Sequence, residues 1–253
     1  MRRLSAARVD MQPNLYLQRH IFACSVPEVI LLDLKKNRYL ALPEHQSRLL
    51  ASRVPGWPSA GLPLGLPLTD QSSPPRTVAT IVDDLITQGI LTRAPSQGKD
   101  ATPATIPTPR RTLVPEPQLI PQSAVSTSQR VRRYLPAMFW SAITATTTLR
   151  LKSIEHIVSK VSARRGGTRI DVDLPSVVED FYWLRPFVFS GNQRCLFHSL
   201  TLLLFLSRFG IHPRWVFGVR KAPFSAHCWL QDGDVVLNDR VERVAMFTPI
   251  MVV

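Results

Sequence analysis

The chain has 253 residues, three cysteines, 22 prolines and a formal net charge of +13. This length can bury one large core or two modest ones, and the positive charge favours an acidic partner, whether peptide or nucleic acid. The small, odd number of cysteines excludes a disulfide scaffold and indicates a reducing compartment. The first residues lack a signal core and no apolar run could span a bilayer, so we expect a cytoplasmic protein without an integral membrane segment.

Residues 15–93 are expected to form a first domain. Three short runs predict an antiparallel meander of strands, at 20–24, 29–34 and 39–42. Pro43, at a favoured first-turn position, predicts a helix to about Arg53. A stripe of apolar residues predicts a second helix over 76–88, and Gly89 suits its end. Strands followed by helices indicate a winged-helix-like fold for this domain.

A peptide is the partner that this first domain suits best. Asp83 and Asp84 on the last helix would face phosphate in a DNA complex, so we expect no nucleic acid partner. An extended peptide could instead add to the third strand by backbone hydrogen bonds. The residues expected around this peptide are Tyr39, Leu40, Leu42, Val78, Val82 and Leu85. A purely structural domain is the remaining alternative.

Proline divides the chain into parts. Residues 94–128 carry seven prolines among Ser, Thr and Gln, which predicts an extended, disordered linker. Residues 54–75 are equally rich in Pro and Gly, which excludes a regular helix.

The second domain, 129–253, begins with one or two helices, broken or kinked near Pro136. Their apolar patch and basic residues allow a membrane-surface helix, but we favour a helix packed on the domain with its basic face in water.

The rest of the second domain centres on one apolar helix. Residues 174–189 predict a helix, and a polar loop leads from it to Cys195. Cys195 opens an apolar run that predicts a buried helix ending at Gly210. Three strand-like runs follow, at 214–219, 226–231 and 235–239. Helices followed by a meander make this domain, like the whole chain, α+β.

Cys195, His227 and an acid in this order are typical of nucleophilic catalysis. A helix N-terminus and a nearby imidazole both lower the pKa of a thiol. His227 then needs a group that orients its ring. A two-residue turn at Asp232-Gly233 would place Asn238 opposite His227, whereas a three-residue loop or a bulge would place Asp239 there. The alternation of side chains along the strands therefore does not decide between Asn238 and Asp239.

Two further aspects of the site can be predicted. The Cys195 backbone N–H is the natural oxyanion donor, and the Gln193 or Asn192 side chain could add a second. A zinc site is the rival interpretation, with the ligands Cys195, His198, His227 and Cys228. His227 and Cys228 are adjacent in a strand, so their side chains should point to opposite faces, which makes it awkward for both to bind the same zinc ion. We therefore expect no metal, with Cys228 in the core and His198 as a supporting or packing residue.

Residues 129–253 carry several motifs in this order: Arg194-Cys195-Leu196, Ser199-Leu200, Phe209-Gly210-Ile211, 216–220, 223–229 and Leu237-Asn238-Asp239. Together these motifs resemble the transglutaminase-like B proteins of lasso peptide biosynthesis. In that family Cys, His and Asp form a catalytic triad, and the matching positions here are Cys195, His227 and Asp239. The resemblance thus favours Asp239 over Asn238. The family usually has alanine where this chain has Cys228.

Residues 18–93 resemble the fused PqqD-like leader-recognition domain of such proteins, on Leu31-Leu32-Asp33-Leu34 and Tyr39-Leu40-Ala41-Leu42. The resemblance implies that this domain binds the leader of a ribosomally made precursor. The second domain would be a cysteine peptidase that cuts leader from core through a thioester. A cyclase similar to asparagine synthetase would then receive the core.

The sequence also allows expectations about cofactors and about alternative functions. Some family members are described as needing ATP, but the chain has no Gly-rich phosphate loop. We therefore expect no cofactor, and any ATP dependence would be indirect or belong to the cyclase. The alternatives are a catalytically idle scaffold that delivers the leader, and an acyl transferase acting on an amine.

Overall fold

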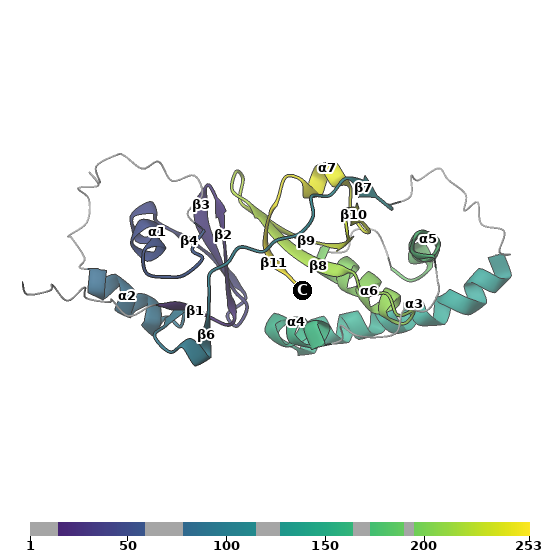
Figure 1. The fold of residues 1–253 in the computed structure, drawn as a ribbon. Helices are drawn as coiled ribbons and strands as arrows, with labels where there is room; N and C mark the ends of the chain where they lie inside the picture. The colour runs from purple at the N-terminus through teal and green to yellow at the C-terminus, as the bar shows by residue number, and fades with distance from the viewer. Residues whose placement is uncertain (1–14, 59–77, 115–126, 164–172, 190–194) are drawn as a thin grey trace, which may run out of the picture.

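The computed structural model describes residues 15–58, 78–114, 127–163, 173–189 and 195–253 (Figure 1). Most of the Pro/Gly-rich stretch 54–75, and the loop before Cys195, lie outside this part of the chain. No helix in these five ranges combines the length and the apolarity needed to cross a bilayer.

The predicted meander of three strands is confirmed. Its strands are β2 (Ile21–Val26), β3 (Glu28–Asp33) and β4 (Arg38–Leu42). They form one antiparallel sheet in the order β2-β3-β4, and Asn37 takes the left-handed conformation in the turn before β4. Such a conformation suits Asn better than most side chains.

Two helices and a small second sheet accompany the meander. The helices are α1 (Glu44–Ala51) and α2 (Val78–Thr87), close to the predicted ranges. The second sheet joins β5 (Leu91–Thr92), β1 (Tyr16–Gln18) and β6 (Gly98–Lys99). Since 59–77 lie outside the described residues, the winged-helix-like fold of this domain stays a prediction.

Strand β3 is buried on both faces. Val29 and Leu31 pack into a core that includes residues of α1 and α2. Ile30, Leu32 and Leu34, which alternate with them, pack into the large core of the C-terminal part. Figure 1 shows the sheet between these helices on one side and β8, β9 and β11 on the other. The continuous apolar run in β3 is typical of a strand covered on both faces.

Residues 94–114 differ from the disordered linker expected for 94–128. The short helix η1 (Pro95–Gln97) leads into β6, and β7 (Arg111–Thr112) pairs in parallel with β10 (Val235–Val236). Between them, Gln231 Nε2 donates to the Pro107 carbonyl at 2.6 Å. The chain is extended here, as predicted, but its backbone groups find partners in both halves of the protein.

The break in the first helices of the C-terminal part is not at Pro136. Helix α3 (Thr127–Leu151) continues through this proline, and the chain turns at 152–153 into α4 (Ile154–Ala163). A proline removes one backbone hydrogen bond. Packing compensates, because Met138 is fully buried and the Tyr134 ring lies 6.2 Å from that of Phe205.

The face of α3 also differs from the expected basic surface at one position. Arg130, one of the basic residues of this helix, is buried and lies 3.1 Å from Asp180 of α5 (Leu174–Leu184). Burial raises the pKa of Asp180, while Arg130 acts to lower it. The two side chains therefore form an ion pair between α3 and α5 with little access to water. Four large apolar side chains of α3 are exposed: Phe139, Trp140, Ile143 and Leu151.

Replacing Arg130 by methionine is expected to lower the free energy of unfolding by about 3–5 kcal/mol, because Asp180 is left buried without its partner. Adding Asp180→Leu should restore most of this loss. Urea denaturation followed by circular dichroism measures both variants. Arg132→Met, on the exposed side of the same helix, is the control and should stay within about 0.5 kcal/mol of wild type. Equal effects of the Arg130 and Arg132 changes would contradict a role for the pair.

The C-terminal part places helices against a five-stranded sheet. Its strand order is β11-β8-β9-β10-β7. Its remaining elements are η2 (Arg185–Phe187), α6 (Cys195–Ser207), β8 (Arg214–Arg220), β9 (Ser225–Asp232), α7 (Val241–Val244) and β11 (Thr248–Val252). The predicted Cys195 helix and the strands over 214–219 and 226–231 are confirmed, whereas α7 and β11 were not predicted.

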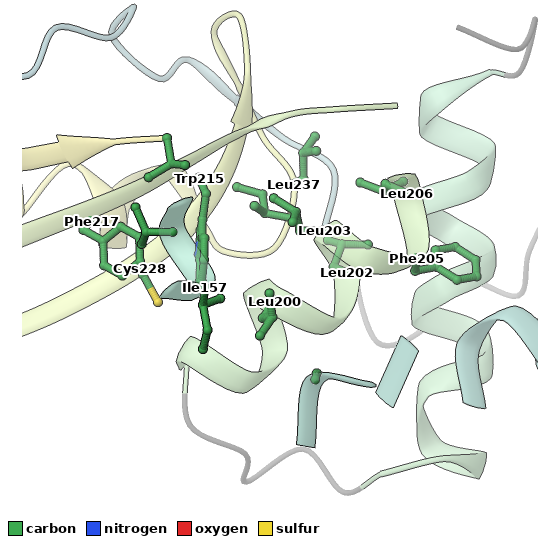
Figure 2. Packing of buried hydrophobic residues seen from close by; sticks show 14 of the residues in the cluster. Ile157, Leu200, Leu202, Leu203, Phe205, Leu206, Trp215, Phe217, Cys228 and Leu237 are labelled. Atoms are coloured by element: carbon green, nitrogen blue, oxygen red, sulfur yellow. The ribbon is translucent and has the colours of Figure 1, made fainter. Parts of the chain in front are cut away.

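Helix α6 forms the centre of this core. Figure 2 shows its side chains, among them Leu200, Leu203 and Phe205, together with Trp215, Phe217 and Cys228 of the sheet. The helix is apolar nearly all round because it packs against β9 as well as against α3 and α5. This packing fixes Cys195, the first described residue of α6, against the beginning of β9.

Candidate active site

The structure brings Cys195, His227 and Asp239 together. Cys195 is half-buried, and its thiol lies within hydrogen-bonding reach of the His227 ring. His227 Nε2 lies 2.5 Å from Asp239 Oδ2, which leaves Nδ1 as the ring nitrogen free to face the thiol. The ring is buried and stacks at 6.1 Å on Trp229, with Phe247 at 5.1 Å. These contacts hold the imidazole in one plane.

The observed register between β9 and β10 is neither the one expected for a turn at Asp232-Gly233 nor the one expected for a three-residue loop. β9 and β10 pair Asp232 with Val235, so the turn consists of Gly233 and Asp234, with Gly233 at φ +57°. The ladder continues only to Leu237, whose N–H donates to the Leu230 carbonyl. The chain then leaves the sheet, and this departure, rather than strand parity, brings Asp239 to the imidazole.

Asn238, the rival orienting residue, has a structural task. Its Oδ1 accepts a hydrogen bond from the Leu230 N–H at 2.7 Å and thereby closes the ladder where the strand ends. Asp239 in turn is held by its neighbours, since the Arg240 N–H donates to its Oδ1 at 2.8 Å. Thr112 of β7 donates its hydroxyl to the Asp239 carbonyl at 2.6 Å. Sequence reasoning missed Thr112 because it lies in the segment predicted to be a linker.

The charges of the site favour a thiolate–imidazolium pair. A hydrogen bond from Cys228 lowers the pKa of Cys195, burial acts against it, and His227 lowers it further, to about 4. Burial alone would lower the pKa of His227, but hydrogen bonds to Asp239 and Cys195 raise it to about 9. Burial also acts to raise the pKa of Asp239, yet the bonds from His227 and the Arg240 N–H keep it below its usual value. Between these values the thiol is ionised and the ring is protonated.

Cys228 is buried, as predicted, but its thiol does more than pack. It contacts the Cys195 thiol, and its sulfur lies 3.4 Å from Ser199 Oγ. Trp215 Nε1 donates to the same Ser199 oxygen at 2.9 Å. The bond to Cys195 and burial raise the pKa of Cys228, so it keeps its proton and can donate it to the Cys195 thiolate. Adjacent strand residues 227 and 228 thus both reach Cys195.

Replacing Cys228 by alanine is expected to raise the pKa of Cys195 by about one unit, because one charge-assisted hydrogen bond is lost. The pH dependence of Cys195 alkylation by iodoacetamide, followed by mass spectrometry, reports this pKa. Cys24→Ala, at a buried position of β2, is the control: it removes a thiol of similar burial and should leave the pH dependence of Cys195 alkylation unchanged. An unchanged curve in Cys228→Ala would exclude the hydrogen bond as a cause.

A pocket of about 130 Å³ opens in front of Cys195. Its walls come from the C-terminal part and from the β3–β4 hairpin, which contributes Leu32, Leu34, Asn37 and Tyr39. The structure therefore divides the residues expected around a bound peptide. Tyr39 lies opposite Leu32 and faces the pocket, whereas Leu40 and Leu42 lie opposite Leu31 and Val29 on the other face of the sheet.

The other members of that predicted set do not reach the pocket. Leu42, Val82 and Leu85 are buried in the core of the N-terminal part, Leu40 packs against it, and Val78 is half-buried. Strand alternation explains the division, since neighbours along β4 point to opposite faces. The outer edge of β4 has no partner strand among the described residues, so the backbone groups needed for an added strand are present.

The remaining site expectations concern oxyanion donors and metals. Gln193 and Asn192 lie outside the described residues. His198 stacks on Phe181 at 5.8 Å, and burial lowers its pKa to about 4, so this ring is neutral and packs. Over the five described ranges, no group of three His, Cys, Asp or Glu side chains is arranged to hold a metal ion.

Comparison with known proteins identifies the C-terminal part. Residues 139–252 match the family model of the transglutaminase-like superfamily, so this part is a transglutaminase-like domain. Such a domain is compatible with a cysteine peptidase or an acyl transferase. Searches of curated proteins and of solved structures found no significant match. The match begins inside α3 and includes Cys195, His227 and Asp239.

Proposed function

We propose that this protein is a cysteine peptidase that removes the leader from a ribosomally made precursor in lasso peptide biosynthesis. The observation that carries the proposal is the Cys195–His227–Asp239 arrangement at a pocket in a transglutaminase-like domain. Cysteine with a histidine base and an orienting acid is the arrangement of nucleophilic acyl transfer. The lasso assignment rests on the motif resemblance described above.

The first half of the proposed reaction forms an acyl-enzyme. The Cys195 thiolate attacks the carbonyl carbon of the bond between leader and core, and the carbonyl oxygen becomes negative. The Cys195 N–H is suited to stabilise this oxygen. The tetrahedral intermediate collapses, the C–N bond breaks, and protonated His227 gives its proton to the departing amine. The amine is the N-terminus of the core, and the leader remains as a thioester on Cys195.

The second half restores the enzyme. Neutral His227 takes a proton from water as the water oxygen attacks the thioester carbon. The C–S bond breaks, the leader leaves as a carboxylic acid, and the thiolate–imidazolium pair forms again. Asp239 accepts the His227 Nε2–H throughout, which keeps Nδ1 directed at the reacting atoms. The proposed steps use no metal or cofactor, and any need for ATP would be indirect or belong to the partner cyclase.

The N-terminal part is proposed to hold the leader. An extended leader would pair with the outer edge of β4, where backbone hydrogen bonds supply affinity. The freed core would pass to a cyclase similar to asparagine synthetase. We place the reaction in the cytoplasm, in keeping with free thiols at the site.

Mass spectrometry of a candidate precursor peptide tests the proposal. Wild type and Cys195→Ala are each incubated with the peptide, with and without the partner cyclase. A single cut between leader and core by wild type alone is expected. Tight leader binding without any cut under any condition would instead identify a delivery scaffold. Leader–amine adducts in place of hydrolysis, when a primary amine is supplied, would identify an acyl transferase.

A further inference from the structure

The pocket in front of Cys195 is bounded on one side by a segment that lies far away in the sequence. One wall consists of Leu32, Leu34, Asn37 and Tyr39 of the β3–β4 hairpin. The other walls carry the reacting groups, with Cys195, Leu196, Ile154, Phe217, Ala226, His227 and Cys228. The transglutaminase-like domain by itself thus provides only part of the cavity, and the N-terminal sheet provides the rest.

Several contacts hold the hairpin in this position. Ile30, Leu32 and Leu34 pack into the core of the C-terminal part. At the rim, the Tyr39 ring meets Phe224 edge-on at 5.7 Å, and Lys221 forms a 2.6 Å ion pair with Glu28. Lys221 and Phe224 belong to the connection between β8 and β9, the strand that carries His227. The hairpin is therefore attached to the connection that leads directly into the strand of His227.

The size of the pocket limits what it can receive. Its volume of about 130 Å³ is well below the several hundred Å³ of a typical ligand pocket. A protein cavity of roughly 150 Å³ suits benzene, a group of six carbons. One leucine side chain, with four carbons, fits such a space, whereas the ten ring and methylene atoms of tryptophan do not.

The chemistry of the pocket limits the occupant further. Apart from the reacting Cys195 and His227, its lining residues carry no charge, and most of them are apolar. Burial, with smaller effects of the nearby Cys228 and Cys195 thiols, raises the pKa of Tyr39 to about 12, so its hydroxyl stays neutral. A charged side chain would lose its hydration here without gaining a partner of its own.

We propose that the β3–β4 hairpin is a substrate-selecting wall, and that the pocket takes one uncharged side chain no larger than leucine, next to the carbonyl that Cys195 attacks. Leu32, Leu34 and Tyr39 determine this selectivity. The inference rests on the proposed function and deepens it, because it assigns the N-terminal sheet a place in the site in addition to leader binding at the edge of β4.

Acetyl-aminoacyl chloromethyl ketones carrying Ala, Leu, Trp or Asp side chains test the wall in the full chain. The Cys195 thiolate displaces chloride from each probe and forms a thioether, which intact mass spectrometry follows over time. Iodoacetamide, which has no side chain, gives the reactivity of the thiolate and normalises every rate. Wild type is expected to favour Ala and Leu over Trp and Asp by about tenfold or more.

Variants of residues in the β3–β4 hairpin then test whether this wall causes the preference among the probe side chains. Leu32→Ala enlarges the pocket and should reduce the preference for Leu over Trp by about tenfold. Leu31→Ala is the matched control, because it removes the same atoms from the opposite face of β3 and should keep the wild-type order. Tyr39→Ala, at a half-buried position on the same wall, gives a second enlargement if Leu32→Ala fails to fold.

Three results would overturn the inference in distinguishable ways. Wild type that reacts with iodoacetamide at Cys195 but shows no side-chain preference would exclude the selecting wall and leave the nucleophile in place. A wild-type order retained in both Leu32→Ala and Tyr39→Ala would place the selectivity elsewhere. A Cys195 that fails to react with iodoacetamide near neutral pH would remove the proposed function and this inference with it.

Discussion

Replacing Asp239 by asparagine is expected to lower the rate of peptide cleavage by about a thousand- to ten-thousand-fold, with the fold intact. The Asp239 carboxylate accepts the His227 Nε2–H at 2.5 Å and so directs Nδ1 at Cys195. An asparagine can instead present its NH₂ group, which favours the wrong tautomer of the ring. Single-turnover cleavage followed by mass spectrometry measures the loss.

Asp232→Asn is the matched control for this prediction. Asp232 is an exposed carboxylate at the end of β9, the strand that carries His227, and its replacement removes the same charge. This variant should cleave at nearly the wild-type rate. Equal rates for Asp239→Asn and wild type would show that the carboxylate does not orient the imidazole.

The thiolate–imidazolium pair predicts a bell-shaped pH profile for cleavage. Thiolate forms as the pH rises through the Cys195 pKa of about 4, so activity should rise there. The proton needed by the departing amine is lost as the pH passes the His227 pKa of about 9, so activity should fall there. Initial rates across this range, in a buffer series of constant ionic strength, test both limbs.

His227→Gln should change the thiol as well as cleavage. Without the imidazolium the Cys195 pKa rises, and at pH 6 the rate of iodoacetamide alkylation should fall by about tenfold or more. Cys24 is a convenient internal reference, because burial raises its pKa to about 12 and keeps it unreactive. An alkylation rate at pH 6 equal to that of wild type would show that the thiolate does not depend on His227.

Much of the fold could be predicted from local patterns. The short apolar runs predicted β2, β3 and β4, and the longer apolar run after Cys195 predicted α6. These elements carry a strong local signal because their side chains alternate between buried faces or are buried all round. Short pieces such as β1, β6 and β7 carry no such signal, since they exist only because a partner strand lies beside them.

The candidate site shows the same limit. Cys195 and His227 could be selected from residue type and position, but strand parity could not decide between Asn238 and Asp239. The deciding feature is the point at which the chain leaves the ladder after Leu237, and this depends on the Asn238 side chain and on β7 from another part of the sequence. The pocket could not be foreseen either, because its hairpin wall follows from how the two halves pack.

Strand β3, with one face in each hydrophobic core, has a consequence for folding. Unfolding of the N-terminal half would expose Ile30, Leu32 and Leu34 together with the surface they cover, so neither half can melt without a cost to the other. Heat denaturation is therefore expected as one cooperative transition rather than two. A protease cut within 115–126 should leave two fragments that remain associated and melt together, as a single folding unit made of two chains.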